Sequence, residues 1–496
     1  MSVGLSRPFS PITRRHLCVG VGLALAAIAL PKRAIAEPFV KDGYRILNAR
    51  PGLAFLRGKN ESPTPIWGYD GMSPGPTLRV KQGDEFKVRL FNDLHQATTV
   101  HWHGLRLPNA MDGVPHLTQA PIEPGLSFDY QFAPPDAGTF WYHAHFGSSE
   151  QLARGLYGVF VVEERNPVEV DRDLVLVIDD WRLQDNGEIQ PSFGNFHDAM
   201  MAGRLGQFVT VNSEDKLNLP VKANERLRLR IVNTANSRIF LFRIARHRVR
   251  VMAVDGQPCT PDVAPNGMLR LAPGTRVDLF LDASLEPGSR APIMVDDLHG
   301  GELEVAQLVY DAGQAIREMS LPEPKQLPDN PLPAKLDIAN ALKIDMPLDG
   351  GGMGMMMGGM GGDMGIMAGR IGGEMRPGRF NGFGIPPQER IWALASMSAT
   401  GHNGPPVFKV ERGRTVVLNF VNRTAFPHAM HVHGHHFRHL NGEGDSWKPF
   451  WLDTVIVDVQ RTERIAFVAD NPGKWMIHCH MIEHMATGMA AWFQVT

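Results

Sequence analysis

Four short motifs gather histidine residues at a spacing that suits metal binding. Ten of the 20 His fall in these motifs, and Met489 follows the only Cys among them by ten residues. One His-x-His pair is weak evidence, but several together, with a Cys between two His in the last, predict a metal centre of more than one ion. The motifs are His101-Trp102-His103, His143-Ala144-His145, His428-Ala429-Met430-His431-Val432-His433, and His478-Cys479-His480 with His484.

Alternation along β-strands divides these side chains between two faces. Residues i and i+2 share a face, and residue i+1 points to the other. One face is expected to carry His428, Cys479, His484 and Met489, which are the ligand types of a blue-copper electron-transfer site. The other face collects eight imidazoles, too many for one metal ion and suited to a cluster of three. These are His101, His103, His143, His145, His431, His433, His478 and His480.

The elements that must position these motifs are short β-strands. Alternating and β-branched runs recur between turns, and no long stretch holds the 3.6-residue period of a helix. A strand–turn–strand pattern occurs three times and predicts three related β-sandwich domains, at about 37–165, 166–320 and 330–496. The three copies are Val80-Lys81-Gln82-Gly83-Asp84, Val221-Lys222-Ala223-Asn224-Glu225 and Val410-Glu411-Arg412-Gly413-Arg414.

Taken in order, the motifs resemble those of the three-domain multicopper oxidases, which include laccases and bacterial cuprous oxidases. The resemblance is closest over residues of about 71–164 and 405–496. It implies an all-β chain of three consecutive cupredoxin-like Greek-key sandwiches with four copper ions. Type 1 copper would be bound by His428, Cys479 and His484 with Met489 axial, and type 2 copper by His101 and His431. The two type 3 coppers would be bound by His103, His143, His145, His433, His478 and His480.

Such a protein takes single electrons from a reducing substrate at type 1 copper and reduces O2 to water at the cluster. This reduction consumes four protons, so acids must lie within reach. Asp112, nine residues after His103, and Glu483, directly before His484, match carboxylates that relay protons in the family, and we expect both to be catalytic. The alternatives are a turn residue at Asp112 and a structural hydrogen bond at Glu483. An axial Met489 predicts a modest oxidant.

A low-complexity insertion in the third domain bears on the substrate. Residues 346–375 hold nine Met among many Gly and cannot build a core. Thioethers select Cu(I), and bacterial cuprous oxidases carry a similar insertion, so Cu(I) oxidation in copper tolerance is favoured over an incidental Met content. The candidate ligands of substrate Cu(I) are Met353, Met355, Met356, Met357, Met360, Asp363 and Met364.

Two positions depart from the pattern of the cuprous oxidases. Those relatives bind substrate Cu(I) through an acidic residue and a Met, four and two residues before the first type 1 His, where this chain has Thr424 and Phe426. This departure weakens the case for Cu(I) and strengthens the alternative of laccase-like oxidation of phenols or aromatic amines. A copper-binding or storage protein, which would not consume O2, is an alternative of another class.

The first 36 residues have the features of an export signal. Arg14-Arg15 precede an apolar run that is too short to span a membrane, and Ala34-Ile35-Ala36 is a small-x-small cleavage site. We expect export to the periplasm by the twin-arginine route and a monomeric mature chain that is not held in the membrane. A formal net charge of −2 gives no basic patch for nucleic acid.

The remaining Cys and His receive weaker predictions. Cys18 leaves with the signal, so Cys259 is expected to be a buried thiol outside any disulfide framework. His435, His436 and His439 are expected at the surface or in support of the ligands, with accessory copper binding as the alternative.

Overall fold

The computed structural model describes residues 40–496 except 265–266, 297–298, 334, 353–389, 396–403, 443 and 445, and these residues form one compact unit. The expected signal segment lies outside the described residues. So do all seven candidate Cu(I) ligands of the insertion, with Met367 and Met375. Among the described helices, none is both long and apolar enough to cross a membrane.

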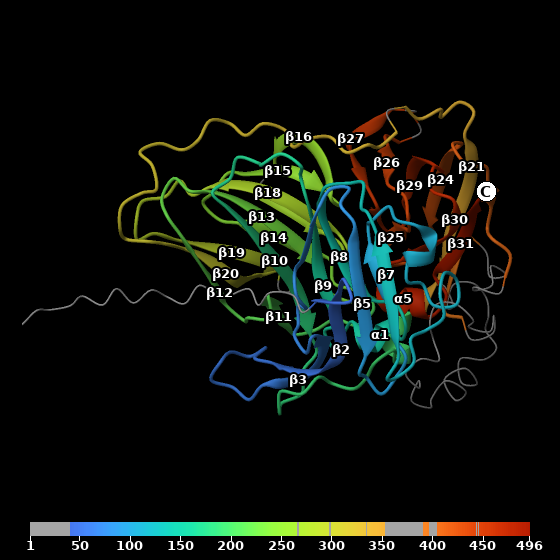
Figure 1. The fold of residues 1–496 in the computed structure, drawn as a ribbon, viewed down its shortest axis with the longest axis horizontal. Coiled ribbons are helices and arrows are strands. Elements are labelled where there is room, and N and C mark those ends of the chain that lie inside the picture. Colours follow the sequence, from blue (N-terminus) through green and yellow to red (C-terminus); the bar gives the residue numbers. More distant parts are fainter. Residues whose placement is uncertain are drawn as a thin grey trace, which may run out of the picture. The chain divides into compact units, whose positions relative to one another are not determined.

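The first sandwich packs two sheets against each other (Figure 1). One sheet contains β1 (Val40–Lys41), β2 (Tyr44–Ala54), β3 (Thr64–Tyr69), β5 (Phe86–Asn92) and β7 (Ser127–Phe132). The other contains β4 (Leu78–Lys81), β6 (Val100–His103), β8 (Gly138–Ala144) and β9 (Tyr157–Glu163). Alternate residues of β5 are buried, as a strand with one face on the core requires.

The middle sandwich repeats this plan. Its first sheet contains β10 (Arg172–Trp181), β11 (Phe208–Val211), β13 (Arg226–Asn233), β15 (Val249–Val254), β16 (Gln257–Val263) and β18 (Arg276–Asp282). Its second sheet contains β12 (Leu217–Val221), β14 (Phe240–Ile244), β17 (Met268–Leu271), β19 (Arg290–Asp296) and β20 (Glu302–Tyr310).

The third sandwich carries the C-terminal motifs. One sheet contains β21 (Leu342–Gly350), β22 (Trp392–Leu394), β24 (Thr415–Asn422), β26 (Phe437–Leu440), β27 (Trp447–Leu452) and β29 (Thr462–Val468). The other contains β23 (Lys409–Val410), β25 (His428–Val432), β28 (Thr454–Val457), β30 (Gly473–Cys479) and β31 (Ala490–Val495). The all-β fold class is confirmed. Short helices lie between strands: η1 (Asn109–Met111), α1 (Ser148–Gln151), α2 (Phe196–Met200) and α5 (Ile482–Ala486).

The threefold sequence repeat has the same topological place in each sandwich. The strand before each repeat turn, β4, β12 or β23, pairs in parallel with the last strand of its sandwich, β9, β20 or β31. The strand after the turn, β5, β13 or β24, pairs in parallel with β2, β10 or β21. One strand–turn–strand unit therefore joins the two sheets in all three sandwiches.

A buried Asn closes each of these units. The side-chain amides of Asn92 and Asn233 each donate to two backbone carbonyls of their own sandwich, and that of Asn422 donates to three. Their side-chain carbonyls each accept from the backbone N–H two residues later. Because these groups are buried and mutually satisfied, the corner fixes the start of the following loop.

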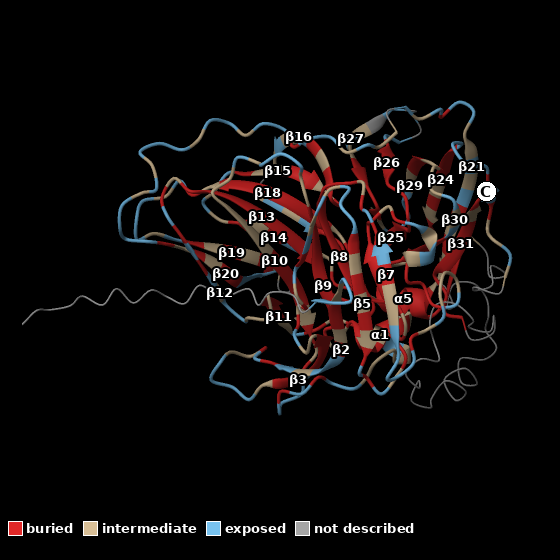
Figure 2. Ribbon diagram, viewed as in Figure 1, coloured by how far each residue is buried: buried red, intermediate tan, exposed pale blue. Residues whose placement is uncertain are grey.

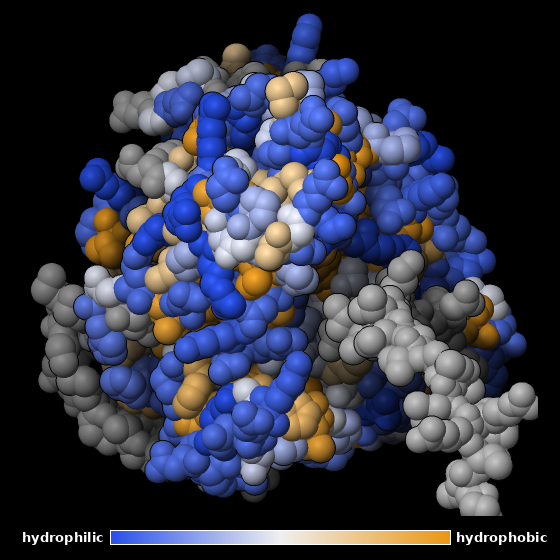
Figure 3. All heavy atoms as spheres, turned by 90° about the vertical axis from the view of Figure 1, so that its left-hand side faces the viewer, coloured by the Kyte–Doolittle hydropathy of each residue, from blue (hydrophilic) through white to orange (hydrophobic). Residues whose placement is uncertain are grey.

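The largest cluster of buried apolar side chains runs through the first and third sandwiches and reaches Val177 and Trp181 of the middle one, and the second largest lies within the middle sandwich. Figure 2 shows the buried residues concentrated in the strands and the exposed ones in the connecting loops. In Figure 3, the face at the left of Figure 1 is mostly hydrophilic, with scattered apolar residues. Met346, predicted within the insertion, is instead a buried core residue, because it alternates with Leu348 along β21.

Candidate copper centre

Two antiparallel strand pairs set out the cluster face. In the first sandwich, β6 pairs with β8 so that His101 lies opposite His143. In the third, β25 pairs with β30 so that His431 lies opposite His478 and Met430 lies opposite Cys479. The predicted alternation therefore holds, since His478 and the adjacent Cys479 face opposite sides of β30.

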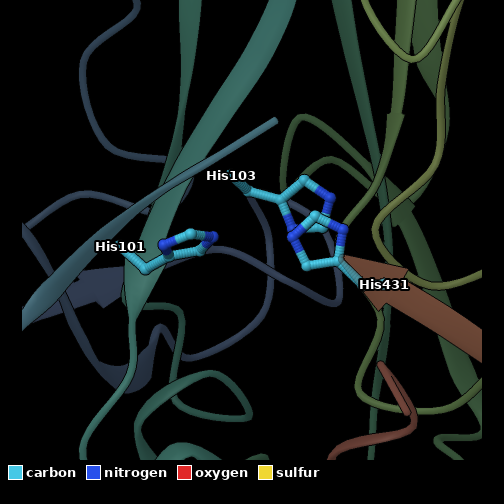
Figure 4. Close-up of side chains that lie close together, drawn as sticks. All are labelled: His101, His103 and His431. Carbon is cyan, nitrogen blue, oxygen red and sulfur yellow. The ribbon is translucent and has the colours of Figure 1, made fainter. Parts of the chain in front are cut away.

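The eight predicted imidazoles meet where these two sandwiches face each other, and all eight are buried. The rings of His103 and His431 stack with centroids 3.7 Å apart, and Figure 4 shows the two rings overlapping beside His101. The rings of His101 and His433 stack at 3.9 Å. Residues more than 300 positions apart in sequence thus build one site.

Possible ligand nitrogens fall into three groups, and within each group they all lie within 4.8 Å of one another. The groups are His101, His103 and His431; His103, His143 and His480; and His145, His433 and His478. This grouping has the size expected for three metal ions bound close together.

The nitrogens have the chemistry of metal ligands. Six of the eight rings have a buried ring nitrogen without a hydrogen-bond partner among the described residues, namely those of His101, His103, His143, His145, His431 and His480; outside the eight, His435 and His436 each have one as well. His478 Nδ1 lies 2.9 Å from the Cys479 carbonyl and His433 Nδ1 lies 3.0 Å from Asp112 Oδ2. Both Nδ1 atoms therefore carry the proton, and the two Nε2 lone pairs face each other at 3.0 Å. A cation between them would relieve this repulsion.

The electrostatics keep these rings neutral. Burial, and then the neighbouring imidazoles, hold the pKa values of His143, His145 and His478 well below the ordinary value. His433 and His480 are affected in the same way. Neutral imidazole is the form that binds metal, so the unpaired buried nitrogens fit copper ligands.

The second predicted site lies on the other face of β30. Cys479 Sγ lies 3.6 Å from His428 Nδ1 and 3.8 Å from His484 Nδ1, and the two nitrogens are 3.2 Å apart. Met489 is buried; its backbone carbonyl accepts from the Cys479 N–H, and its N–H donates to the His484 carbonyl. Burial raises the pKa of the Cys479 thiol to about 12, so a bound cation is needed to form the thiolate.

Asp112 lies directly against the cluster. It is fully buried, with Oδ2 3.0 Å from His433 Nδ1 and Oδ1 3.2 Å from His101 Nδ1. Its backbone carbonyl also lies 2.8 Å from His101 Nδ1. A carboxylate that touches rings of two groups can orient both and exchange protons next to the cluster.

Glu483 lies on α5 and bonds to the middle sandwich. Its carboxylate accepts hydrogen bonds from the Arg204 N–H at 3.0 Å, the Ser237 hydroxyl at 2.9 Å and the Asn236 amide at 3.2 Å. These contacts favour the structural alternative, and the proton-relay role of Glu483 stays a prediction.

Sequence analysis missed Asp453, the central acid of a buried ion-pair cluster. Its carboxylate lies 3.1 Å from His103 Nε2 and accepts two hydrogen bonds from Arg276, at 2.9 and 2.6 Å. Burial alone would raise the pKa of Asp453, but Arg276 and His103 hold it well below its ordinary value. Asp255 accepts from the Asp453 N–H at 3.2 Å, and burial with the charge of Asp453 raises its pKa to about 7.

The lesser predictions have mixed outcomes. Cys259 is a buried free thiol, as expected, and burial raises its pKa to about 12. His435, His436 and His439 are buried, so a surface position is wrong for all three. His436 Nε2 lies 3.7 Å from Asp453 Oδ2, so His436 lies next to the carboxylate that contacts His103.

Comparison with known proteins identifies the family. Three family models, each described as multicopper oxidase, match residues 56–167, 172–303 and 380–496. The chain belongs to the multicopper oxidases. The predicted family is thus confirmed, and its members couple oxidation of a reducing substrate to reduction of O2.

Individual multicopper oxidases resemble the chain over most of its length. Multicopper oxidase MmcO of Mycobacterium tuberculosis is 28% identical, covering 85% of this chain and 81% of that protein. Laccase-2 of Fomitopsis schrenkii is 28% identical, covering 85% and 84%. The crystal structure of a multi-copper oxidase from Pseudomonas thermotolerans matches with a TM-score of 0.76 and 31% identity, covering 91% of this chain and 98% of that one.

Proposed function

We propose that this multicopper oxidase binds four copper ions with the predicted ligands. His428, Cys479 and His484, with Met489, would hold type 1 copper, and His101 and His431 would hold type 2 copper. The groups His103, His143, His480 and His145, His433, His478 would each hold one type 3 copper. Bound copper would supply one-electron transfer and O2 reduction. Support comes from the buried nitrogens that lack other partners.

The chain would connect the two sites through β30. Cys479 is bonded to His478 and His480, which belong to different type 3 groups. An electron accepted at Cys479 therefore has a path of covalent bonds to either group. Asp112 would fix which ring nitrogen of His101 and of His433 carries the proton, while the surrounding buried side chains exclude water.

We propose Cu(I) as the substrate, with copper tolerance as the biological role. The observation that carries this is where the Met-rich insertion joins the described fold. A Cβ atom on Gly352, the last described residue before it, would lie 3.1 Å from Met200 Cε. After it, Trp392 donates to the Ala199 carbonyl at 2.6 Å and its ring lies 4.2 Å from that of His484. The insertion is therefore attached beside the proposed type 1 site.

Oxygen uptake by the copper-loaded protein tests this proposal, with stabilised Cu(I) and a simple phenol offered separately. One variant replaces the eight Met of residues 353–375 by Leu at unchanged length, and a second deletes the segment. We expect both to lose fast uptake with Cu(I) while the type 1 absorption is kept. Loss in the deletion alone would make the thioethers irrelevant. Faster phenol oxidation after deletion would identify a laccase, and copper binding without uptake a storage protein.

We also propose that the mature chain acts as a periplasmic monomer after twin-arginine export. The paired Arg14-Arg15 before the apolar run support this. Cell fractionation of the wild type beside Arg14→Lys/Arg15→Lys tests it, since the variant should remain in the cytoplasm as precursor. Sedimentation of the exported protein would report the oligomeric state.

A further inference from the structure

A tight turn of the middle sandwich contacts both of the sandwiches that carry the predicted ligands. The turn consists of residues 254–257 and joins β15 to β16, with Val254 paired to Gln257. Asp255 and Gly256 have φ angles of +48° and +77°, as the favoured two-residue hairpin turn requires. Asp255 is nevertheless fully buried, and a buried Asp needs partners. The side chain therefore has a role beyond that of an ordinary surface turn.

On one side the β15–β16 turn packs against β8, the strand that carries His143. A Cβ atom on Gly138 would lie 2.0 Å from the carbonyl oxygen of Gly256. A Cβ atom on Gly256 would in turn lie 2.6 Å from the ring of Phe140. The backbones of the middle and first sandwiches thus approach to a distance that any side chain at position 138 would prevent.

On the other side the Asp255 carboxylate binds the third sandwich through backbone N–H groups. Its Oδ2 accepts from the N–H of Asp453 and from that of Thr454, each at 3.2 Å. Its Oδ1 accepts from the N–H of Arg276, within the middle sandwich, at 3.1 Å. Both oxygens are therefore occupied by fixed donors, and a charged acceptor makes these hydrogen bonds strong.

The peptide unit between Asp453 and Thr454 connects this contact to a predicted ligand. Its N–H donates to Asp255, and its carbonyl lies 2.9 Å from His431 Nδ1. Because a carbonyl can only accept, Nδ1 carries the proton of the His431 ring. Among the described residues, the buried Nε2 of His431 has no hydrogen-bond partner, so it is the nitrogen left for a metal ion. One peptide unit thus links Asp255 to the orientation of His431.

His103 is held by a different route. Its Nε2 lies 3.1 Å from the side-chain Oδ1 of Asp453, and Arg276 donates two hydrogen bonds to that carboxylate. The side chain of Asp453 is therefore fixed by Arg276, whereas its carbonyl belongs to the peptide unit that Asp255 holds. The proposed type 1 site, around Cys479 on the other face of β30, lies off both routes.

We propose that Asp255 is a positioning residue for the type 2 copper. Its carboxylate fixes the Asp453–Thr454 peptide unit, and the carbonyl of that unit fixes the ring of His431. The middle sandwich, which supplies no predicted ligand, thereby determines how firmly the type 2 ion is retained. The inference rests on the proposed role of His431 as a type 2 ligand.

Asp255→Gly tests the proposal, because Gly keeps the left-handed turn and removes only the carboxylate. The copper-loaded variant and the wild type are dialysed against a graded series of a copper chelator. Type 2 copper is followed by electron paramagnetic resonance and type 1 copper by its absorption. We expect Asp255→Gly to lose type 2 copper at a chelator concentration roughly 10- to 100-fold lower than the wild type, and type 1 copper at an unchanged one. Asp255→Asn tolerates the turn and keeps one acceptor oxygen, so it should lie between them.

Asn224→Gly is the matched control. Asn224 also has a left-handed φ, of +63°, in the middle sandwich, and its side chain donates to the carbonyls of Arg317 and Glu318 after β20. This variant should lower the free energy of unfolding and leave the retention of type 2 copper unchanged.

Three outcomes decide against the two proposals separately. Wild-type retention of type 2 copper in Asp255→Gly would overturn the positioning role. So would a parallel loss of type 1 and type 2 copper, or an equal loss of type 2 copper in Asn224→Gly, since each indicates a general loosening of the fold. A wild type without any type 2 signal would instead refute the ligand assignment.

Discussion

At the residue scale, the two predicted acids have different surroundings. Asp112 touches the rings of His101 and His433, which belong to different ligand groups. Glu483 is satisfied by three donors of the middle sandwich. A carboxylate already bound by fixed donors is poorly placed to move, whereas Asp112 can take part in proton exchange at the cluster. Substitutions at the two residues should therefore have different effects on the reaction with O2.

We predict that Asp112→Asn slows reoxidation of the fully reduced, copper-loaded protein by O2 by roughly 10- to 100-fold. The amide keeps the shape but cannot accept and release protons at neutral pH. The type 1 absorption should be retained, because Asp112 does not touch the type 1 ligands. Stopped-flow recovery of the absorption measures the rate.

Glu483→Gln is the matched comparison. We expect little change in the rate of reoxidation and a perturbed type 1 spectrum, since the segment after α2, whose Met201 carbonyl lies against His484, loses an anchor at Arg204. Equal slowing in both variants would instead make Glu483 part of the proton path.

Residues that come into contact with a metal ligand only when the chain folds were not predictable from the sequence. The motifs revealed the His, Cys and Met ligands because their spacing is local. Asp453 belongs to none of the His motifs, and it contacts His103, which is 350 positions away in the sequence. Met201 contacts His484 through its backbone carbonyl, which any residue type could supply.

At the element scale, strand alternation carried most of the correct prediction. It separated Cys479 from its two His neighbours, because a strand has only two faces. The repeat likewise indicated three related sandwiches. The prediction failed at Met346, where composition was used in place of alternation. Met346 was assigned to the insertion by its residue type, although it continues the buried pattern of β21.

The repeated Asn corner yields a prediction with an internal control. Only the corner of the third sandwich is connected to the proposed type 1 site, because Thr424 Oγ1 bonds both Asn422 Oδ1 and His428 Nε2, each at 2.8 Å. Asn422→Ala and Asn233→Ala each leave buried carbonyls unpaired, which should lower the free energy of unfolding by about 1–3 kcal/mol. Only Asn422→Ala should shift the type 1 absorption. Denaturant unfolding and visible spectra measure the two effects, and a shift in both variants would rule out this connection.

At the scale of the whole molecule, the middle sandwich supplies no predicted ligand but completes the site. Its β18 begins with Arg276, which binds Asp453 of the third sandwich and the Thr139 carbonyl of the first. Gly274 lies so close that a Cβ there would come within 3.0 Å of both His103 and His480. The middle domain thus holds the other two at the spacing that the cluster requires.

This role predicts unequal effects for two Arg that bridge the same pair of sandwiches. Arg276→Met leaves Asp453 buried without its cation, which should cost about 3–5 kcal/mol of unfolding free energy and lower the copper content. Arg270→Met removes an exposed pair with Asp458 and should cost at most about 1 kcal/mol, with full copper loading. Both changes remove one positive charge, so net charge cannot explain a difference. Denaturant unfolding of the copper-free proteins, with metal analysis after loading, makes the comparison. Similar losses would mean that the buried cluster does not hold the domains together.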